Sequence, residues 1–155
     1  MARIHADQHL PGVGPAQVAA LWWDTDRWPS FVDGFSHVHK REDDWPAPGG
    51  RLVWDARPAS DRGRVVERVA WRDPHGGGET LIEDARLTGT QVVRFAATGS
   101  GTLVTFELRY ASKAPAAPLA DLVYVRRRLR KALARSIERF AREVAMEREL
   151  AADVQ

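Results

Sequence analysis

The stretch LVYVRRRLRKALARSIERF, residues 122–140, predicts the central part of one long helix. Apolar side chains recur on one side of it with the helical period of 3.6 residues. They are Leu119, Leu122, Leu129, Leu133, Ile137, Phe140 and Val144. Pro118 suits the first turn and Asp121 the positive end of the helix dipole, so we expect a helix over about 118–150. Such a helix needs a surface that covers its apolar stripe.

That surface is predicted upstream, as a meander of antiparallel strands. Residues 3–10 alternate between apolar and polar side chains, which is typical of a half-buried strand. Turn-forming segments such as LTGT (87–90) divide the later part of the chain. The further strands expected there are 35–42, 50–57, 63–72, 79–88, 90–98 and 102–111. No segment of helical length separates them, which disfavours a parallel sheet.

Two short helices are expected between the first strand and the rest of the sheet. They cover 15–24 and 26–34, with Asp26 as the cap of the second and Gly34 as its end. The fold class is therefore α+β, with a seven-stranded curved antiparallel sheet wrapped round one long C-terminal helix. Because a curved sheet rarely closes perfectly round a single helix, we also expect an internal cavity.

The composition is that of one ordinary globular domain. The chain has 155 residues, of which 44% are hydrophobic and 28% charged. We expect a single domain over 1–150 and a short tail over 151–155. A net charge of +2 is too small to favour nucleic acid as a partner. The absence of cysteine excludes disulfides, thiol catalysis and cysteine-bound metals.

Nothing in the sequence indicates export or a membrane segment. The N-terminal stretch MARIHADQHLPGVG lacks the apolar core of a secretory signal. No apolar run approaches the roughly 20 residues that span a bilayer. A cytoplasmic location is expected, and the sequence does not indicate an oligomeric state.

Several segments together resemble a known superfamily. They are VAALWWDTDRWPSFVDGFSHV (18–38), PGGRLVW (48–54), GRVVERV (63–69), GTLVTFELRY (101–110) and RRLRKALARSIERF (127–140). The sequence resembles the START-like polyketide cyclase/dehydrase superfamily (SRPBCC), whose fold is the helix-grip. The resemblance spans nearly the whole chain, and it implies an apolar pocket between the sheet and the C-terminal helix. No stretch lets a cyclase's catalytic residues be carried over, so the catalytic residues stay unknown.

The alternation of side chains along the strands predicts which residues line that pocket. In 63–72, Val65, Glu67, Val69 and Trp71 share the inward face, which makes Glu67 a carboxyl group either in the pocket or at its rim. The expected ligand-binding residues are Trp54, Glu67, Trp71, Phe106, Tyr110, Arg126, Leu129, Arg130 and Leu133. Trp54 and Trp71 are the tryptophans expected to touch a ligand, and the short helices are expected to close one end of the pocket.

Arg126 is the exception within the apolar stripe of the helix, and Arg130 lies close to it. A guanidinium on an apolar face costs several kcal/mol unless it is paired. Arg126 could extend along apolar surface to the rim, could pair with Glu67, or could meet an anionic or carbonyl group of a ligand. The sequence leaves these three alternatives open.

Two clusters of histidines do not predict a metal site. His5 and His9 share a strand face with Asp7, as do His37 and His39 on another strand. The resemblance places these two strands at opposite sheet edges, so the histidines are expected at the surface. No phosphate loop or dinucleotide-binding motif is present, and no cofactor is expected.

Three functions remain open. The leading prediction is binding of a hydrophobic small molecule, of the lipid, isoprenoid or aromatic polyketide type. The alternative is a polyketide aromatase/cyclase that assists aldol closure or dehydration, in which Arg126 polarises a carbonyl and Tyr110 or Glu67 transfers a proton. The third is a protein-interaction module that uses the basic back of the helix.

Overall fold

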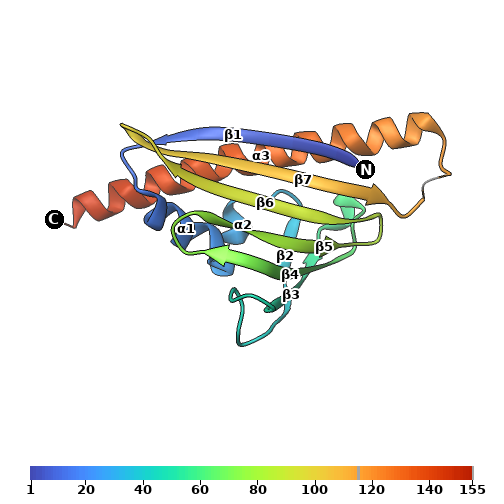
Figure 1. The fold of residues 1–155 in the computed structure, drawn as a ribbon, viewed down its shortest axis with the longest axis horizontal. Coiled ribbons are helices and arrows are strands. Elements are labelled where there is room, and N and C mark those ends of the chain that lie inside the picture. Colours follow the sequence, from blue (N-terminus) through green and yellow to red (C-terminus); the bar gives the residue numbers. More distant parts are fainter. Residues whose placement is uncertain (115, 155) are drawn as a thin grey trace.

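The computed structural model describes residues 1–114 and 116–154, and it contains one seven-stranded antiparallel sheet and one long helix (Figure 1). The strands are β1 (Ala2–Pro11), β2 (Phe35–Arg41), β3 (Arg51–Ala56), β4 (Arg64–Asp73), β5 (Gly77–Glu83), β6 (Leu87–Ala97) and β7 (Gly101–Ser112). The helices are α1 (Pro15–Trp23), η1 (Thr25–Arg27), α2 (Trp28–Phe31), η2 (Pro58–Ser60) and α3 (Leu119–Asp153). The predicted fold class is confirmed.

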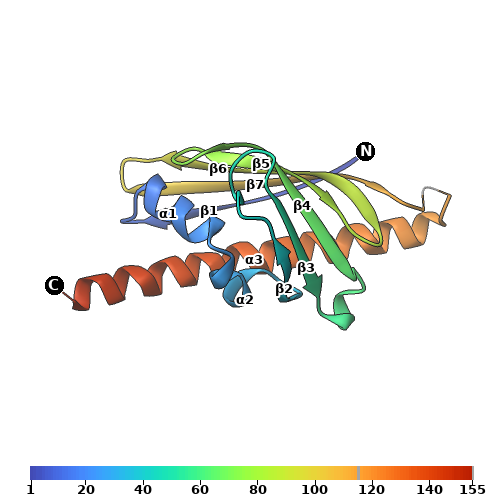
Figure 2. The ribbon, with the colours of Figure 1, turned by 90° about the horizontal axis from the view of Figure 1, so that it is seen from below.

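The sheet follows the order β1-β7-β6-β5-β4-β3-β2, so that β1 and β2 form its two edges. α3 runs along one face of the sheet, and β2–β4 bend round toward it (Figure 2). α1 and α2 lie at one end of the same face, where α2 contacts α3. The inner face of the sheet, the short helices and α3 therefore enclose one core.

Only the middle of α3 is buried. Leu133, Ile137, Phe140 and Val144 are buried, whereas Leu119, which belongs to the expected stripe, is 75% exposed. The helix extends past the sheet at both of its ends (Figure 1). The stripe therefore predicted the helix correctly, but its N-terminal part lies beyond the sheet that was expected to cover it.

The turn between β5 and β6 differs from the expectation. LTGT was expected to separate two strands, but Leu87 begins β6 and the turn lies at 84–86. The Asp84 carboxylate forms this turn by accepting the backbone N–H groups of Arg86 (2.8 Å) and Leu87 (3.0 Å). Gly89 instead allows β6 to approach β7 closely, because a Cβ at this position would lie only 2.1 Å from the backbone carbonyl oxygen of Arg109.

Two further boundaries are corrected. Asp26 was expected to cap the second short helix, but Asp24 provides the cap by accepting the N–H of Asp26 (3.1 Å) at the start of η1. α3 continues to Asp153, so that residues 151–153 of the expected tail are helical. Residue 155 of that tail lies outside the described residues.

Candidate functional site

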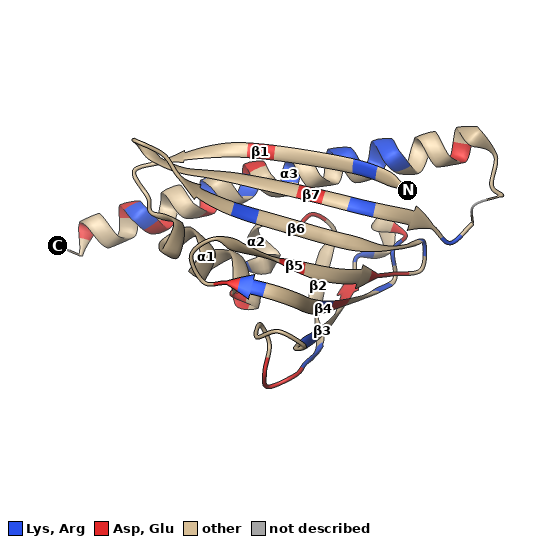
Figure 3. Cartoon of the chain, in the orientation of Figure 1, with Lys and Arg blue, Asp and Glu red and all other residues tan. Residues whose placement is uncertain are grey.

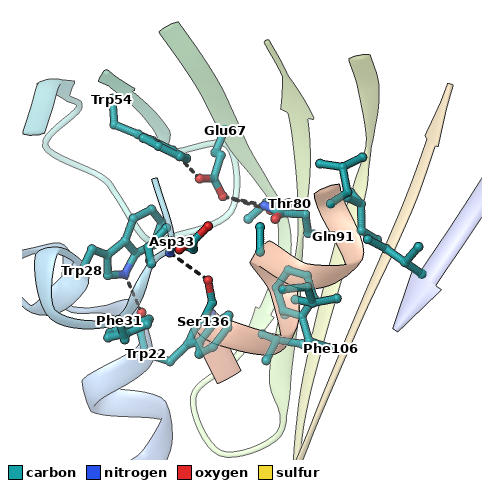
Figure 4. A pocket seen from close by; sticks show the side chains of 18 of the residues that line it. Trp22, Trp28, Phe31, Asp33, Trp54, Glu67, Thr80, Gln91, Phe106 and Ser136 are labelled. Carbon is teal, nitrogen blue, oxygen red and sulfur yellow. Dashed lines mark hydrogen bonds between the residues drawn. The ribbon is translucent and has the colours of Figure 1, made fainter. Parts of the chain in front are cut away.

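A cavity of about 100 Å³ lies between the inner face of the sheet and α3 (Figure 4). Five of the nine expected ligand-binding residues line it; they are Trp54, Glu67, Phe106, Leu129 and Leu133. The volume is below the roughly 300–1,000 Å³ that is typical of ligand pockets. It still exceeds the roughly 30 Å³ that one water molecule occupies in the liquid.

Aromatic side chains from the short helices account for the small volume. The Trp22 ring lies 5.7 Å from Phe31, 5.5 Å from Phe106 and 5.1 Å from Phe140, centroid to centroid. Trp28 fixes its own indole by donating from Nε1 to the carbonyl of Trp22 (2.8 Å). The short helices therefore close this end of the cavity and also fill part of it.

Glu67 is a buried carboxyl group in the cavity, whose lining also includes the partly exposed Asp33. Glu67 is 4% exposed, and three side chains from β3, β5 and β6 donate to it. Trp54 Nε1 donates to Oε2 (2.7 Å), while Gln91 Nε2 (2.8 Å) and Thr80 Oγ1 (3.4 Å) donate to Oε1. Because Thr80 and Gln91 are direct partners across β5 and β6, the sheet register itself brings these groups together (Figure 4).

The pKa of Glu67 lies above its ordinary value. Burial is the largest cause, because an apolar environment disfavours the charged carboxylate. The hydrogen bond from Trp54, the positive charge of Arg62 and the bonds from Gln91 and Thr80 oppose this effect without cancelling it. When it is protonated, this carboxyl group can donate a hydrogen bond to an acceptor inside the cavity.

Trp71 does not line the cavity, contrary to the expectation. A bulge between Val69 and Trp71 interrupts the pairing of β4 with β5 and reverses the alternation of side chains. Trp71 consequently faces outward, where its Nε1 donates to Glu79 (2.9 Å) and the guanidinium of Arg94 lies over its ring. Strict alternation predicted the inward face correctly as far as Val69 and incorrectly beyond it.

Arg126, Arg130 and Tyr110 also lie outside the cavity, and the hydrogen bonds of Glu67 include none from Arg126. Arg126 is half-buried, and Arg130 is exposed. Both lie near Tyr110: burial raises the pKa of Tyr110, and the two positive charges oppose that rise. Of the three alternatives left open for Arg126, pairing with Glu67 is not observed, since neither the hydrogen bonds nor the nearby charges of Glu67 include Arg126.

Arg62 occupies the position near Glu67 that one of the three alternatives gave to Arg126. It lines the cavity, and its guanidinium lies 5.3 Å from the centroid of the Trp54 ring. Its Nε donates to the fully buried carboxylate of Asp84 (2.8 Å). The positive charge is thus neutralised within the wall of the cavity.

Sequence reasoning missed Arg62, Thr80 and Gln91. Thr80 and Gln91 could have been found by aligning the strands on Glu67, but the misplaced turn shifted the expected strand boundaries. Arg62 precedes β4 in a loop, where alternation assigns no face. Only the three-dimensional path of that loop brings it to the cavity.

The histidines lie at the two edges of the sheet, as expected. His37 and His39 contact Asp55 on the neighbouring strand (3.0 and 3.8 Å), far from β1 in the strand order. Within residues 1–114 and 116–154, no three acidic or histidine side chains converge as metal ligands would. In the same part of the chain, none of the helices has the length and apolar character needed to traverse a bilayer.

Comparison with known proteins extends these observations. The family described as polyketide cyclase / dehydrase and lipid transport matches residues 1–145. No curated protein matches the sequence significantly.

Solved structures with the same fold share little sequence with this chain. A protein from Thermus thermophilus is 17% identical with a TM-score of 0.72, covering 94% of this chain and 99% of its own. A conserved protein from Geobacillus kaustophilus is 13% identical (TM-score 0.70; 94% and 96% covered). An AHSA1-like protein from Aeromonas hydrophila is 17% identical (TM-score 0.60; 94% of each chain covered).

Proposed function

The chain belongs to the polyketide cyclase/dehydrase and lipid transport family, and we propose that its cavity binds an apolar small molecule that hydrogen-bonds to Glu67. The observation that carries this proposal is the buried carboxyl group of Glu67 in a cavity lined largely by aromatic and aliphatic side chains, whose other carboxylate, Asp33, is paired with Arg135. Burial of apolar surface would supply affinity, and one polar group would fix orientation.

The walls favour a ligand with a flat ring system and a carbonyl or hydroxyl group. Trp22, Trp28 and Phe31 offer ring faces and edges from the short helices, and Phe106 does so from β7 (Figure 4). The raised pKa of Glu67 favours its protonated form, which donates to a carbonyl oxygen. Within the lipid, isoprenoid and aromatic polyketide classes, this arrangement fits an aromatic polyketide or a similar aromatic ketone best.

A second candidate function is the aromatase/cyclase, and the raised pKa of Glu67 is the observation that favours it. A carboxyl group whose pKa is raised by burial is better suited to exchange protons with a bound substrate, as closure of a poly-β-ketone chain requires. Arg126 and Tyr110 lie outside the cavity, so in this mechanism Glu67 alone would exchange the proton. Accelerated turnover of a β-diketone would distinguish catalysis from binding.

Filling the cavity tests the binding function. Ala132 lines the cavity, so the ring introduced by Ala132→Phe would occupy space that a ligand needs. We expect the wild type to take up the neutral fluorophore N-phenyl-1-naphthylamine, and the variant to bind it at least about tenfold more weakly, or about 1.4 kcal/mol. Fluorescence titration measures both affinities.

Ala134→Phe is the matched control, because Ala134 lies on the same helix, is exposed and does not line the cavity. This variant should bind the fluorophore as the wild type does. Equal affinities for all three proteins would show that the fluorophore binds elsewhere, and the proposed site would be rejected.

A further inference from the structure

A second hollow, here called the groove, lies beside the cavity and has a volume of about 300 Å³. Its walls come from the N-terminal half of α3, from η2 and from the β5–β6 turn. Asp33, Arg62, Leu129 and Ala132 line both hollows, so the two adjoin at these residues. A ligand of the cavity could therefore extend into the groove.

Positive charge exceeds negative charge in the groove. Its carboxylates are already paired: Asp84 with Arg62, Asp61 with Arg86, and Asp33 with Arg135. Two further cations, Arg128 and Lys131, also line it. Neither forms an ion pair with a side chain in the described part of the chain. Figure 3 shows the concentration of basic residues along this half of α3.

Arg128 is held in position although it has no carboxylate partner among the described residues. One of its terminal nitrogens, Nη2, donates to the backbone carbonyl of Ala59 (2.7 Å), and its guanidinium lies 5.6 Å from the centroid of the Tyr124 ring. A guanidinium carries five N–H donors in a planar fork, which leaves several for a ligand. The geometry of a planar carboxylate matches this fork.

We propose that the groove binds the carboxylate of an amphipathic ligand whose apolar part lies in the cavity; this inference rests on the proposed function. The two hollows would fix the direction of such a ligand. A carboxylate beside Glu67 would be repelled whenever Glu67 is ionised, and it would lose its hydration in an apolar cavity. The same group in the groove meets Arg128 and Lys131. The ligand class is therefore an aromatic ketone that also carries a carboxylate.

The test compares two ligands with the same ring system by isothermal titration calorimetry. These are 1-naphthaleneacetate and its neutral amide, 1-naphthaleneacetamide. For the wild type at low salt we expect the carboxylate to bind about tenfold more tightly than the amide. We expect this preference to shrink as sodium chloride is added, because salt screens charges at an open site.

The variant Arg128→Gln/Lys131→Gln should bind the carboxylate only as tightly as the amide, and its affinity for the amide should match the wild type. Arg127→Gln is the control: Arg127 is an exposed arginine of the same helix that lines neither hollow, and this variant should keep the preference.

Two results would overturn the proposal and leave cavity binding intact. One is equal affinity of the wild type for the two ligands while both still bind. The other is a double variant that loses affinity for both ligands equally. If the wild type binds neither naphthyl ligand nor N-phenyl-1-naphthylamine, the proposed function itself fails, and this inference fails with it.

Discussion

Replacing Asp84 with alanine is expected to destabilise the protein by about 3–5 kcal/mol, the cost of removing one partner of a buried ion pair. The Asp84 side chain is fully buried, and that of Arg62 is 20% exposed. The substitution would leave the guanidinium in the cavity wall without its counter-charge. It would also remove the acceptor for the backbone N–H groups of Arg86 and Leu87, which form the β5–β6 turn.

Chemical denaturation of the two proteins measures this difference. Glu83→Ala provides the matched control, since Glu83 is the adjacent residue and forms an ion pair of similar length with Lys113 (2.7 Å), but at the surface. That variant should lose less than about 1 kcal/mol. If Asp84→Ala costs no more than the control, the Arg62–Asp84 pair does not form part of the cavity wall in solution.

The second large effect concerns Glu67 and pH. Burial raises the pKa of Glu67 in the folded protein, so its carboxyl ionises earlier in the unfolded chain, from about pH 4.5 upward. Ionisation then stabilises the unfolded state more than the folded state, and Glu67 lowers the free energy of unfolding as the pH rises. Below that pH both states are protonated and the effect is absent.

The variant Glu67→Gln should therefore gain stability relative to the wild type as the pH rises above about 4.5. The gain is about 1.4 kcal/mol per pH unit until the pKa of folded Glu67 is reached. A loss of stability that does not depend on pH accompanies this gain. It arises because the glutamine amide cannot accept hydrogen bonds from both Trp54 and Gln91 as the carboxyl group does. Denaturation at several pH values separates the two contributions.

Glu107→Gln is the control of opposite sign. Hydrogen bonding from Arg109 lowers the pKa of Glu107, so its ionised form stabilises the folded protein above the unfolded pKa. That variant should lose stability relative to the wild type as the pH rises. If the Glu67→Gln difference does not change with pH, the carboxyl is hydrated in solution and is not the buried group of the cavity.

The fold was predictable because its signals are local. The helical period of α3 and the alternation of β7 follow from residues close together in the sequence. The inward positions of Trp54, Glu67 and Phe106 were predicted for the same reason. Each of these predictions requires only that successive side chains of a strand point to opposite faces of the sheet.

The errors arise where one residue changes the path of the backbone. The bulge after Val69 turns Trp71 outward, and nothing in the local pattern marks it. Gly89 is typical of a turn, yet it serves a close contact between strands. The hydrogen-bond partners of Glu67 all come from the sheet, but whether Arg126 can reach Glu67 depends on the offset of α3 along the sheet. That offset places Arg126 beside Tyr110, and it is a property of the whole packed core.

Binding of an aromatic ketone inside the cavity can be observed by NMR of methyl-labelled protein with 2-acetylnaphthalene. We expect nuclear Overhauser effects from the ligand ring to methyl groups of Val93, Leu129 and Leu133, which line the cavity. Effects confined to the exposed methyl groups of Leu119 and Val123, with none to the cavity residues, would contradict it.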